Sequence, residues 1–112
     1  MINNIDFDTS PIVAGESRPL RAISNSPPLT VTVLCYLTTP PPPGYRPCSG
    51  GGAAYVKSGE VVTIEADRNV FQYAGNYLDI KVKDLSGDVK TFRLGVIVDS
   101  SGSSTQTMMA GG

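Results

Sequence analysis

The sequence has no histidine and no tryptophan, and only two of its 112 residues are cysteines. Without histidine the chain lacks the side chain that most often acts as a general acid or base near neutral pH, and also the most frequent metal ligand. A Ser-His-Asp or Cys-His arrangement within one chain is excluded for the same reason. We therefore expect a protein that is not an enzyme, with no catalytic residues, no metal ligands, no cofactor and no small-molecule substrate.

Charge is also scarce. Nine basic residues against ten acidic residues give a net charge of −1, and they occur singly. No basic stripe is present to neutralise a phosphate backbone, so we expect no nucleic-acid partner. No apolar run approaches the ~20 residues of a membrane helix, and the first residues lack the basic and apolar segments of a signal peptide. We expect no membrane partner and synthesis in a cytoplasm.

The two cysteines, Cys35 and Cys48, are too few to define a disulfide framework. They are either two thiols, with Cys35 in the core, or one disulfide. Such a bridge would close a loop of about a dozen residues and stabilise the fold by roughly 3 kcal/mol. The sequence leaves both possibilities open.

What the sequence does contain is alternation of apolar and polar residues with a period of two. This pattern predicts a long strand over Leu29–Leu37 and another over Val62–Ala66. Weaker strands are expected at Pro19–Ser24 and Ala53–Lys57. Asp67–Tyr73 has the spacing of a single helical turn. A series of short strands separated by turn residues is typical of an all-β protein, a small antiparallel β-sandwich.

The strongest pattern predicts a β-hairpin. Leu78, Ile80 and Val82 alternate with charged residues, a turn at 84–88 contains a glycine, and the return strand places Phe92, Leu94, Val96 and Val98 inward. Asp79, Asp84 and Asp88 lie on this hairpin. Because Lys81, Lys83 and Lys90 are close in sequence, we interpret these carboxylates as solvated, in cross-strand charge pairs.

Three stretches fall outside the predicted sheets. We expect an N-terminal arm at residues 1–17, a β-sandwich domain at 18–98, and a low-complexity tail at 99–112. Within the domain, residues 39–52 predict a protruding loop that runs from stiff prolines into a glycine hinge. Pro42-Pro43-Gly44-Tyr45 matches the peptide ligand of WW domains. An exposed loop that touches a neighbouring protein explains the same residues.

The run from Gly75 to Gly87 resembles the last hairpin of immunoglobulin-like sandwiches, and most of all the polycystic-kidney-disease type. Its pattern is Gly-x-Tyr, an alternating apolar strand, then Asp-x-x-Gly. Gly59–Ile64 looks like the strand that faces this hairpin across the sandwich. The resemblance implies an immunoglobulin-like fold and a holding or presenting role, with no catalytic residue. Tyr77 lies one residue out of the family pattern, so either a bulge rotates it inward or the tyrosine corner is missing.

These features predict a non-enzymatic virion structural protein made in the host cytoplasm, most of all a capsid cement or decoration protein. Its partners would be neighbouring copies and a major capsid or tail protein. A Gly/Ser/Thr tail cannot order itself, so we expect apolar residues of the arms and loop to pack on neighbouring subunits. The candidate contact residues are Ile2, Ile5, Phe7, Ile12, Val13, Pro42, Pro43, Tyr45, Met108 and Met109.

Two other settings fit the sequence. One is a phage tail or baseplate component. The other is a carbohydrate-binding or adhesion module, in which tyrosines serve as stacking platforms; the candidates are Tyr36, Tyr45, Tyr55, Tyr73 and Tyr77.

Overall fold

A computed structural model describes residues 1–99, and of residues 49–52 the backbone alone. The described chain is all-β. Its strands are β1 (Ile2–Phe7), β2 (Ile12–Val13), β3 (Ser17–Ser24), β4 (Leu29–Leu37), β5 (Gly44–Val56), β6 (Val61–Glu65), β7 (Asn76–Lys83) and β8 (Val89–Ile97). Within residues 1–99 there is no helix long and apolar enough to cross a bilayer.

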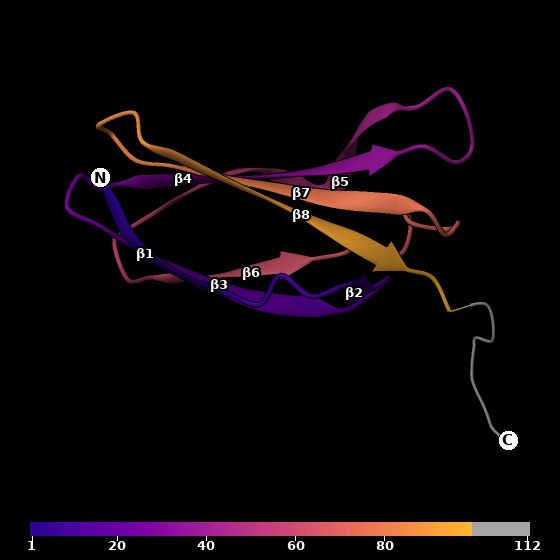
Figure 1. Cartoon of the computed structure of the whole chain (residues 1–112), viewed down its shortest axis with the longest axis horizontal. Coiled ribbons are helices and arrows are strands. Elements are labelled where there is room, and N and C mark those ends of the chain that lie inside the picture. The colour runs from indigo at the N-terminus through magenta and orange to yellow at the C-terminus, as the bar shows by residue number, and fades with distance from the viewer. Residues whose placement is uncertain (100–112) are drawn as a thin grey trace, which may run out of the picture.

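The strands form two sheets that face each other (Figure 1). One sheet has the order β1-β3-β6, and the other has the order β2-β8-β7-β4-β5. Pairing is antiparallel throughout, except that the short β2 runs parallel to β8. The chain therefore starts in the smaller sheet and crosses to the edge of the larger one between β1 and β2.

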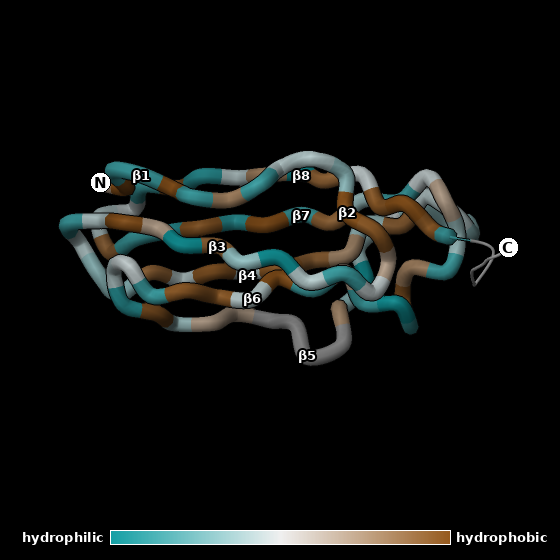
Figure 2. The backbone as a smooth tube through the Cα atoms, turned by 90° about the horizontal axis from the view of Figure 1, so that it is seen from below, coloured by the Kyte–Doolittle hydropathy of each residue, from teal (hydrophilic) through white to brown (hydrophobic). Residues whose placement is uncertain are grey.

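The core follows from the alternation in the sequence. Apolar residues of one parity in β4, β7 and β8 are buried, among them Leu29, Val31, Leu78, Ile80 and Leu94. Figure 2 shows brown and teal segments alternating along β7. The bounds of β4 are those predicted, and the predicted hairpin is confirmed as β7 and β8 joined by the turn at 84–88.

The first 17 residues differ from the expected arm. β1 pairs with β3, and Ile2 and Ile12 are buried in the core of their own chain. Ile5 and Phe7 are partly buried against the same core. The alternation was hidden because the β1–β3 register shifts between Ile2 and Asn4, which breaks the period of two.

Arg18 of β3 holds the crossing between the two sheets. Its buried guanidinium donates hydrogen bonds to the carbonyl oxygens of Asp8, Ser10 and Pro11. It also forms an ion pair of 3.0 Å with Glu16. Carbonyl groups that no strand could pair are thereby satisfied, so the chain can change sheets without leaving buried polar groups unpaired.

The predicted loop 39–52 is also different. Only its first part is a loop, because β5 begins at Gly44 and pairs with β4 as far as Val56. The partner of Leu34 is Pro47 but the partner of Val33 is Gly52, so residues 48–51 form a bulge. Cys48, at the start of the bulge, forms a disulfide with Cys35. The bridge fixes the bulge to β4. The count of two cysteines had left open whether they form a disulfide.

The helical turn expected at Asp67–Tyr73 is present as one isolated turn. The carbonyl oxygen of Asp67 accepts hydrogen bonds from the backbone N–H groups of Val70 and Phe71. Phe71 is buried beneath it. The tail expected at 99–112, with Met108 and Met109, lies outside the described residues except for Asp99.

Asp84 in the β7–β8 turn is buried, and it is not the solvated carboxylate that the sequence suggested. One of its oxygens accepts hydrogen bonds from Ser86 and from the backbone N–H of Asp88. The other accepts the hydroxyl of Ser24 at 2.8 Å and lies 2.6 Å from the α-amino group of Met1. The carboxylate thus holds the β7–β8 turn of the larger sheet together. It also connects this turn to the smaller sheet, at the end of β3 and the start of β1.

These contacts determine the protonation of Asp84. Burial alone would raise its pKa, but the hydrogen bonds from Met1, Ser86 and Ser24 outweigh burial and hold the pKa far below the usual range. The folded chain therefore keeps this carboxylate charged at a pH where the unfolded chain takes up a proton. Its contribution to stability is complete above the unfolded pKa and is lost as the pH falls below about 4.

We expect Asp84→Asn to lower the midpoint of thermal unfolding by on the order of 10 °C at pH 7, since the amide cannot accept all of these bonds. The exposed Asp6 of β1 provides a control with the same change of charge, and Asp6→Asn should shift the midpoint by about 2 °C at most. Circular dichroism melts at pH 7 and pH 3 test both points. The difference between wild type and Asp84→Asn should shrink at pH 3; equal melting at pH 7 would contradict the role given to Asp84.

The disulfide gives a second prediction. The bridge spans a sequence separation of 13 residues, so its reduction should cost about 3 kcal/mol in the free energy of unfolding. Chemical denaturation with and without a reductant measures this loss, and a variant with both cysteines replaced by serine should not respond to the reductant. The unreduced protein should also be lighter than the reduced protein by two hydrogens. A mass equal to that of two free thiols would rule out the bridge.

Candidate interaction face

The outer face of the larger sheet carries side chains that the strand register brings into rows. Tyr45, Tyr36, Tyr77 and Gly95 follow one another across β5, β4, β7 and β8. The next row on this face lies two residues further along each strand and consists of Pro47, Leu34, Asp79 and Arg93. Residues of one row point to the same face of a sheet. Five of these side chains are in contact, and we call them the outer-face cluster: Tyr36, Tyr45, Tyr77, Asp79 and Arg93.

Arg93 is at the centre of the cluster. Its guanidinium donates two hydrogen bonds to Asp79, of 2.8 and 2.9 Å. The same group lies 4.9 Å from the ring centroid of Tyr36 and 4.9 Å from that of Tyr77. A planar guanidinium can bind a carboxylate with two parallel hydrogen bonds and stack on aromatic rings at the same time, which an ammonium cannot do. Arg93 is therefore fixed from three sides.

Tyr45 completes the arrangement from β5. Its hydroxyl donates a hydrogen bond of 3.0 Å to Asp79. Its ring meets that of Tyr36 edge to face, with centroids 4.9 Å apart, a favourable geometry for two aromatic rings. Each side chain of the cluster is thus held by at least one other, so the face has a defined shape before anything binds.

Local charges are fixed as well. The hydrogen bonds from Arg93, and then that from Tyr45, lower the pKa of Asp79 although partial burial opposes them. Asp79 in turn raises the pKa of Tyr45, because its carboxylate accepts the phenol proton in a hydrogen bond. The pKa of Arg93 is raised by the same carboxylate. The ion pair and the neutral phenol consequently persist across the physiological range of pH.

The cluster is partly open to solvent. Tyr45 is 53% exposed and its neighbour Leu34 is 38% exposed, while Tyr36, Tyr77 and Asp79 are half-buried. Beside it lies an open groove of about 660 Å³ that spans β4, β5, β7 and β8; its lining includes Thr32, Leu34, Tyr45, Asp79, Lys81, Thr91 and Arg93. The groove combines one apolar end with hydroxyl and charged groups.

Two neighbouring segments support Tyr45. The loop before it is tied down by Asn76, whose buried side chain accepts hydrogen bonds from the backbone N–H groups of Thr38 and Thr39 and donates to the carbonyl oxygen of Thr39. The disulfide anchors β5 a few residues further along. Both features hold the first part of β5 against β4.

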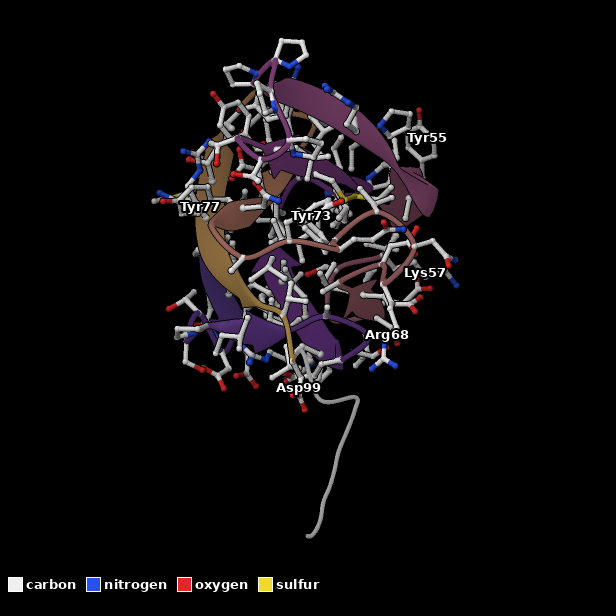
Figure 3. All side chains as sticks on the ribbon, turned by 90° about the vertical axis from the view of Figure 1, so that its right-hand side faces the viewer. Tyr55, Lys57, Arg68, Tyr73, Tyr77 and Asp99 are labelled. Atoms are coloured by element: carbon white, nitrogen blue, oxygen red, sulfur yellow. A yellow bond between two sulfur atoms is a disulfide. The ribbon has the colours of Figure 1, made fainter. Side chains whose placement is uncertain are left out.

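The other predicted contact residues do not gather here. Pro42 and Pro43 are exposed in the loop before β5, and Val13 is exposed on β2. Tyr55 and Tyr73 are exposed, but Tyr55 lies at the far end of β5 and Tyr73 in the connection before β7. In Figure 3, Tyr77 and Tyr55 project on opposite sides of the molecule. Three of the five tyrosines therefore share a site.

Two outcomes concern residues singled out in the sequence. β7 pairs with β4 and with β8 without a register shift, so no bulge turns Tyr77 inward and it lies on the outer face. Asp79 pairs with Arg93 rather than with a lysine. The sequence alone gives Arg93 no role, because the contact depends on which residue of β8 faces Asp79.

Neither protein-family models, nor curated proteins, nor solved structures gave a match. Within the described residues, no group of three or more histidine, cysteine, aspartate or glutamate side chains could hold a metal ion. The outer-face cluster is the site that the geometry itself defines.

The hydrogen bond between Tyr45 and Asp79 can be tested by titration. We expect the phenol of Tyr45 to lose its proton at a higher pH than a free tyrosine, whose pKa is about 10, and Asp79→Asn to shift this titration to lower pH. Carbon-13 labelling of the tyrosine rings resolves the five residues by NMR. The ring signals of Tyr55, which lies apart, should be the same in both proteins at pH 7. Identical titration of Tyr45 in both proteins would show that the bond is absent in solution.

Proposed function

We propose that this chain is a non-enzymatic binding module that attaches to a large protein assembly through its outer-face cluster. The observation that carries the proposal is the preformed, half-exposed group of three tyrosines around the Arg93–Asp79 pair. Tyrosine and arginine are the residue types that most often dominate binding energy at protein interfaces. Because the side chains already hold one another, little conformational entropy is lost when a partner binds.

The arrangement of the strands supports an immunoglobulin-like sandwich as the scaffold. Lettered as in the immunoglobulin fold, with β2 as A′, the two sheets of the described residues read A-B-E and A′-G-F-C-C′. This follows the immunoglobulin order, except that strand D is missing from the first sheet and A′ and C′ are added to the G-F-C sheet. Domains of this architecture present interaction surfaces more often than they catalyse reactions, although a fold alone does not determine function. The proposed face lies on the G-F-C-C′ sheet.

The setting that we propose is a virion, with the chain as a capsid cement protein made in the host cytoplasm; a tail or baseplate position is the alternative. The mode of attachment differs from the arm-mediated contacts expected from the sequence. Since residues 1–17 belong to the two sheets, attachment falls to the sheet face and to the adjoining Pro42–Tyr45 segment. Contacts of modest strength through this face would add up over the many copies on one particle.

A carbohydrate-binding module is the competing function. A sugar ring stacks on an aromatic face that is open to solvent. Arg93 lies over the rings of Tyr36 and Tyr77, so within the cluster Tyr45 alone offers a large exposed ring. This favours a protein partner over a stacking platform for glycans.

The test is co-sedimentation with particles of the encoding virus that lack this protein. We expect wild-type protein to bind saturably, and Tyr45→Ala to weaken binding by about 10-fold or more, as for a typical hot-spot residue. Tyr55→Ala is the matched control, since Tyr55 lies on the same strand and is 74% exposed. It should leave binding unchanged.

Failure of wild-type protein to bind the particles, or equal effects of the two substitutions, would refute the proposal. Saturable binding on a glycan array that depends on Tyr45 would instead support the carbohydrate function.

A further inference from the structure

Two lysines beside the groove have no counter-charge. Lys81 and Lys83 of β7 point to the outer face, with Lys81 at the edge of the groove. Across residues 1–99, neither takes part in an ion pair. Arg93 adds a third positive charge, but Asp79 neutralises it. In a chain whose net charge is −1, this face is locally basic.

The spacing of the two lysines is that of an extended chain. They are two residues apart on one strand, so their Cα atoms are about 7 Å apart and their side chains point to the same side. A partner segment in extended conformation repeats its side chains at the same interval. Acidic residues at alternate positions of such a segment can therefore meet both lysines at once.

The other end of the groove is apolar. Leu34, in the same row as Asp79 and Arg93, and the ring of Tyr45, in the neighbouring row, are exposed there. An aromatic or large aliphatic side chain at one end of the partner segment can cover them. Lysines at one end and an apolar site at the other give the groove a direction, so it distinguishes the two orientations of a bound chain.

We propose that the groove binds an extended segment of a partner protein that carries acidic residues at alternate positions and an apolar residue at one end. This inference rests on the proposed function for the use of the same face, and it adds the chemistry of the partner. The lysines contribute mainly to the rate of association and to the choice of partner, and their effect weakens as salt screens the charges.

The probe is a synthetic nine-residue peptide with glutamate at alternate positions and phenylalanine at one end, titrated into nitrogen-15-labelled protein. We expect amide shifts in β7 and β8 and a dissociation constant on the order of 0.1 to 1 mM at low salt, as for a short contact with few charges. The same peptide with glutamine in place of glutamate should bind at least 10-fold more weakly. Raising the salt concentration to 0.5 M should weaken the glutamate peptide to a similar extent.

Charge reversal locates the contact. Lys81→Glu with Lys83→Glu should weaken binding of the glutamate peptide at least 10-fold and allow a peptide with lysine at the same positions to bind. Lys57→Glu with Lys90→Glu is the matched control, with an equal change of charge away from the outer face, and should leave the affinity within about 2-fold. The rescue by the lysine peptide shows that a variant which binds poorly is still folded.

Three results would overturn the inference: no shifts in β7 and β8, equal binding of the glutamate and glutamine peptides, or equal loss in the control variant. Tighter binding of an anionic polysaccharide or of single-stranded DNA than of the peptide would also overturn it. The proposed function is tested separately. If Tyr45→Ala abolishes particle binding while charge reversal of the two lysines has no effect, binding through the outer-face cluster is supported and the acidic partner is ruled out.

Discussion

The buried carboxylate of Asp84 is the constraint on which the fold depends most. It accepts hydrogen bonds within its own β7–β8 turn and from two segments that are remote in sequence, the start of β1 and the end of β3. These segments belong to both sheets, so one side chain fixes one end of the sandwich. An unpaired charge at a buried position would be costly, and the donors around Asp84 require the hairpin turn to take this one position relative to β3.

The rigidity of the outer face likewise depends on a few polar side chains that each hold an irregular segment in place. Residues 1–99 have a small core and no long helix, and their irregular connections are held by single side chains: Arg18 at the crossing between the sheets, and Asn76 at the loop after β4. The disulfide does the same for the bulge in β5. Tyr45 can stand out from the surface because the backbone on either side of it is fixed.

A strand could be predicted from the sequence where its own pattern of apolar and polar residues stabilises it, and not where it depends on residues remote in sequence. β4, β7 and β8 alternate cleanly, because each buries one side against the core. The bounds of β4 and the pairing of β7 with β8 could therefore be predicted from the sequence. β1 and the first part of β5 could not, whereas the last part of β5 was expected as the strand Ala53–Lys57. β1 contains a register shift, and β5 is rich in glycine and proline and is a strand only because β4 lies beside it. The outer-face cluster was also out of reach, since Tyr36, Tyr45 and Arg93 meet only once the register of four strands is known.

The bulge in β5 affects how this edge of the larger sheet can pair with another strand. β5 is the edge of the larger sheet, and an edge strand offers backbone groups to any other strand that comes near. Here that edge is interrupted, since residues 48–51 are inserted between the positions paired with Leu34 and Val33, and Pro47 has no N–H to donate. An incoming strand would meet two short rows of backbone N–H and C=O groups that are out of register, instead of one continuous row. This edge of the sheet is therefore a poor template for pairing with a strand of another copy of the chain.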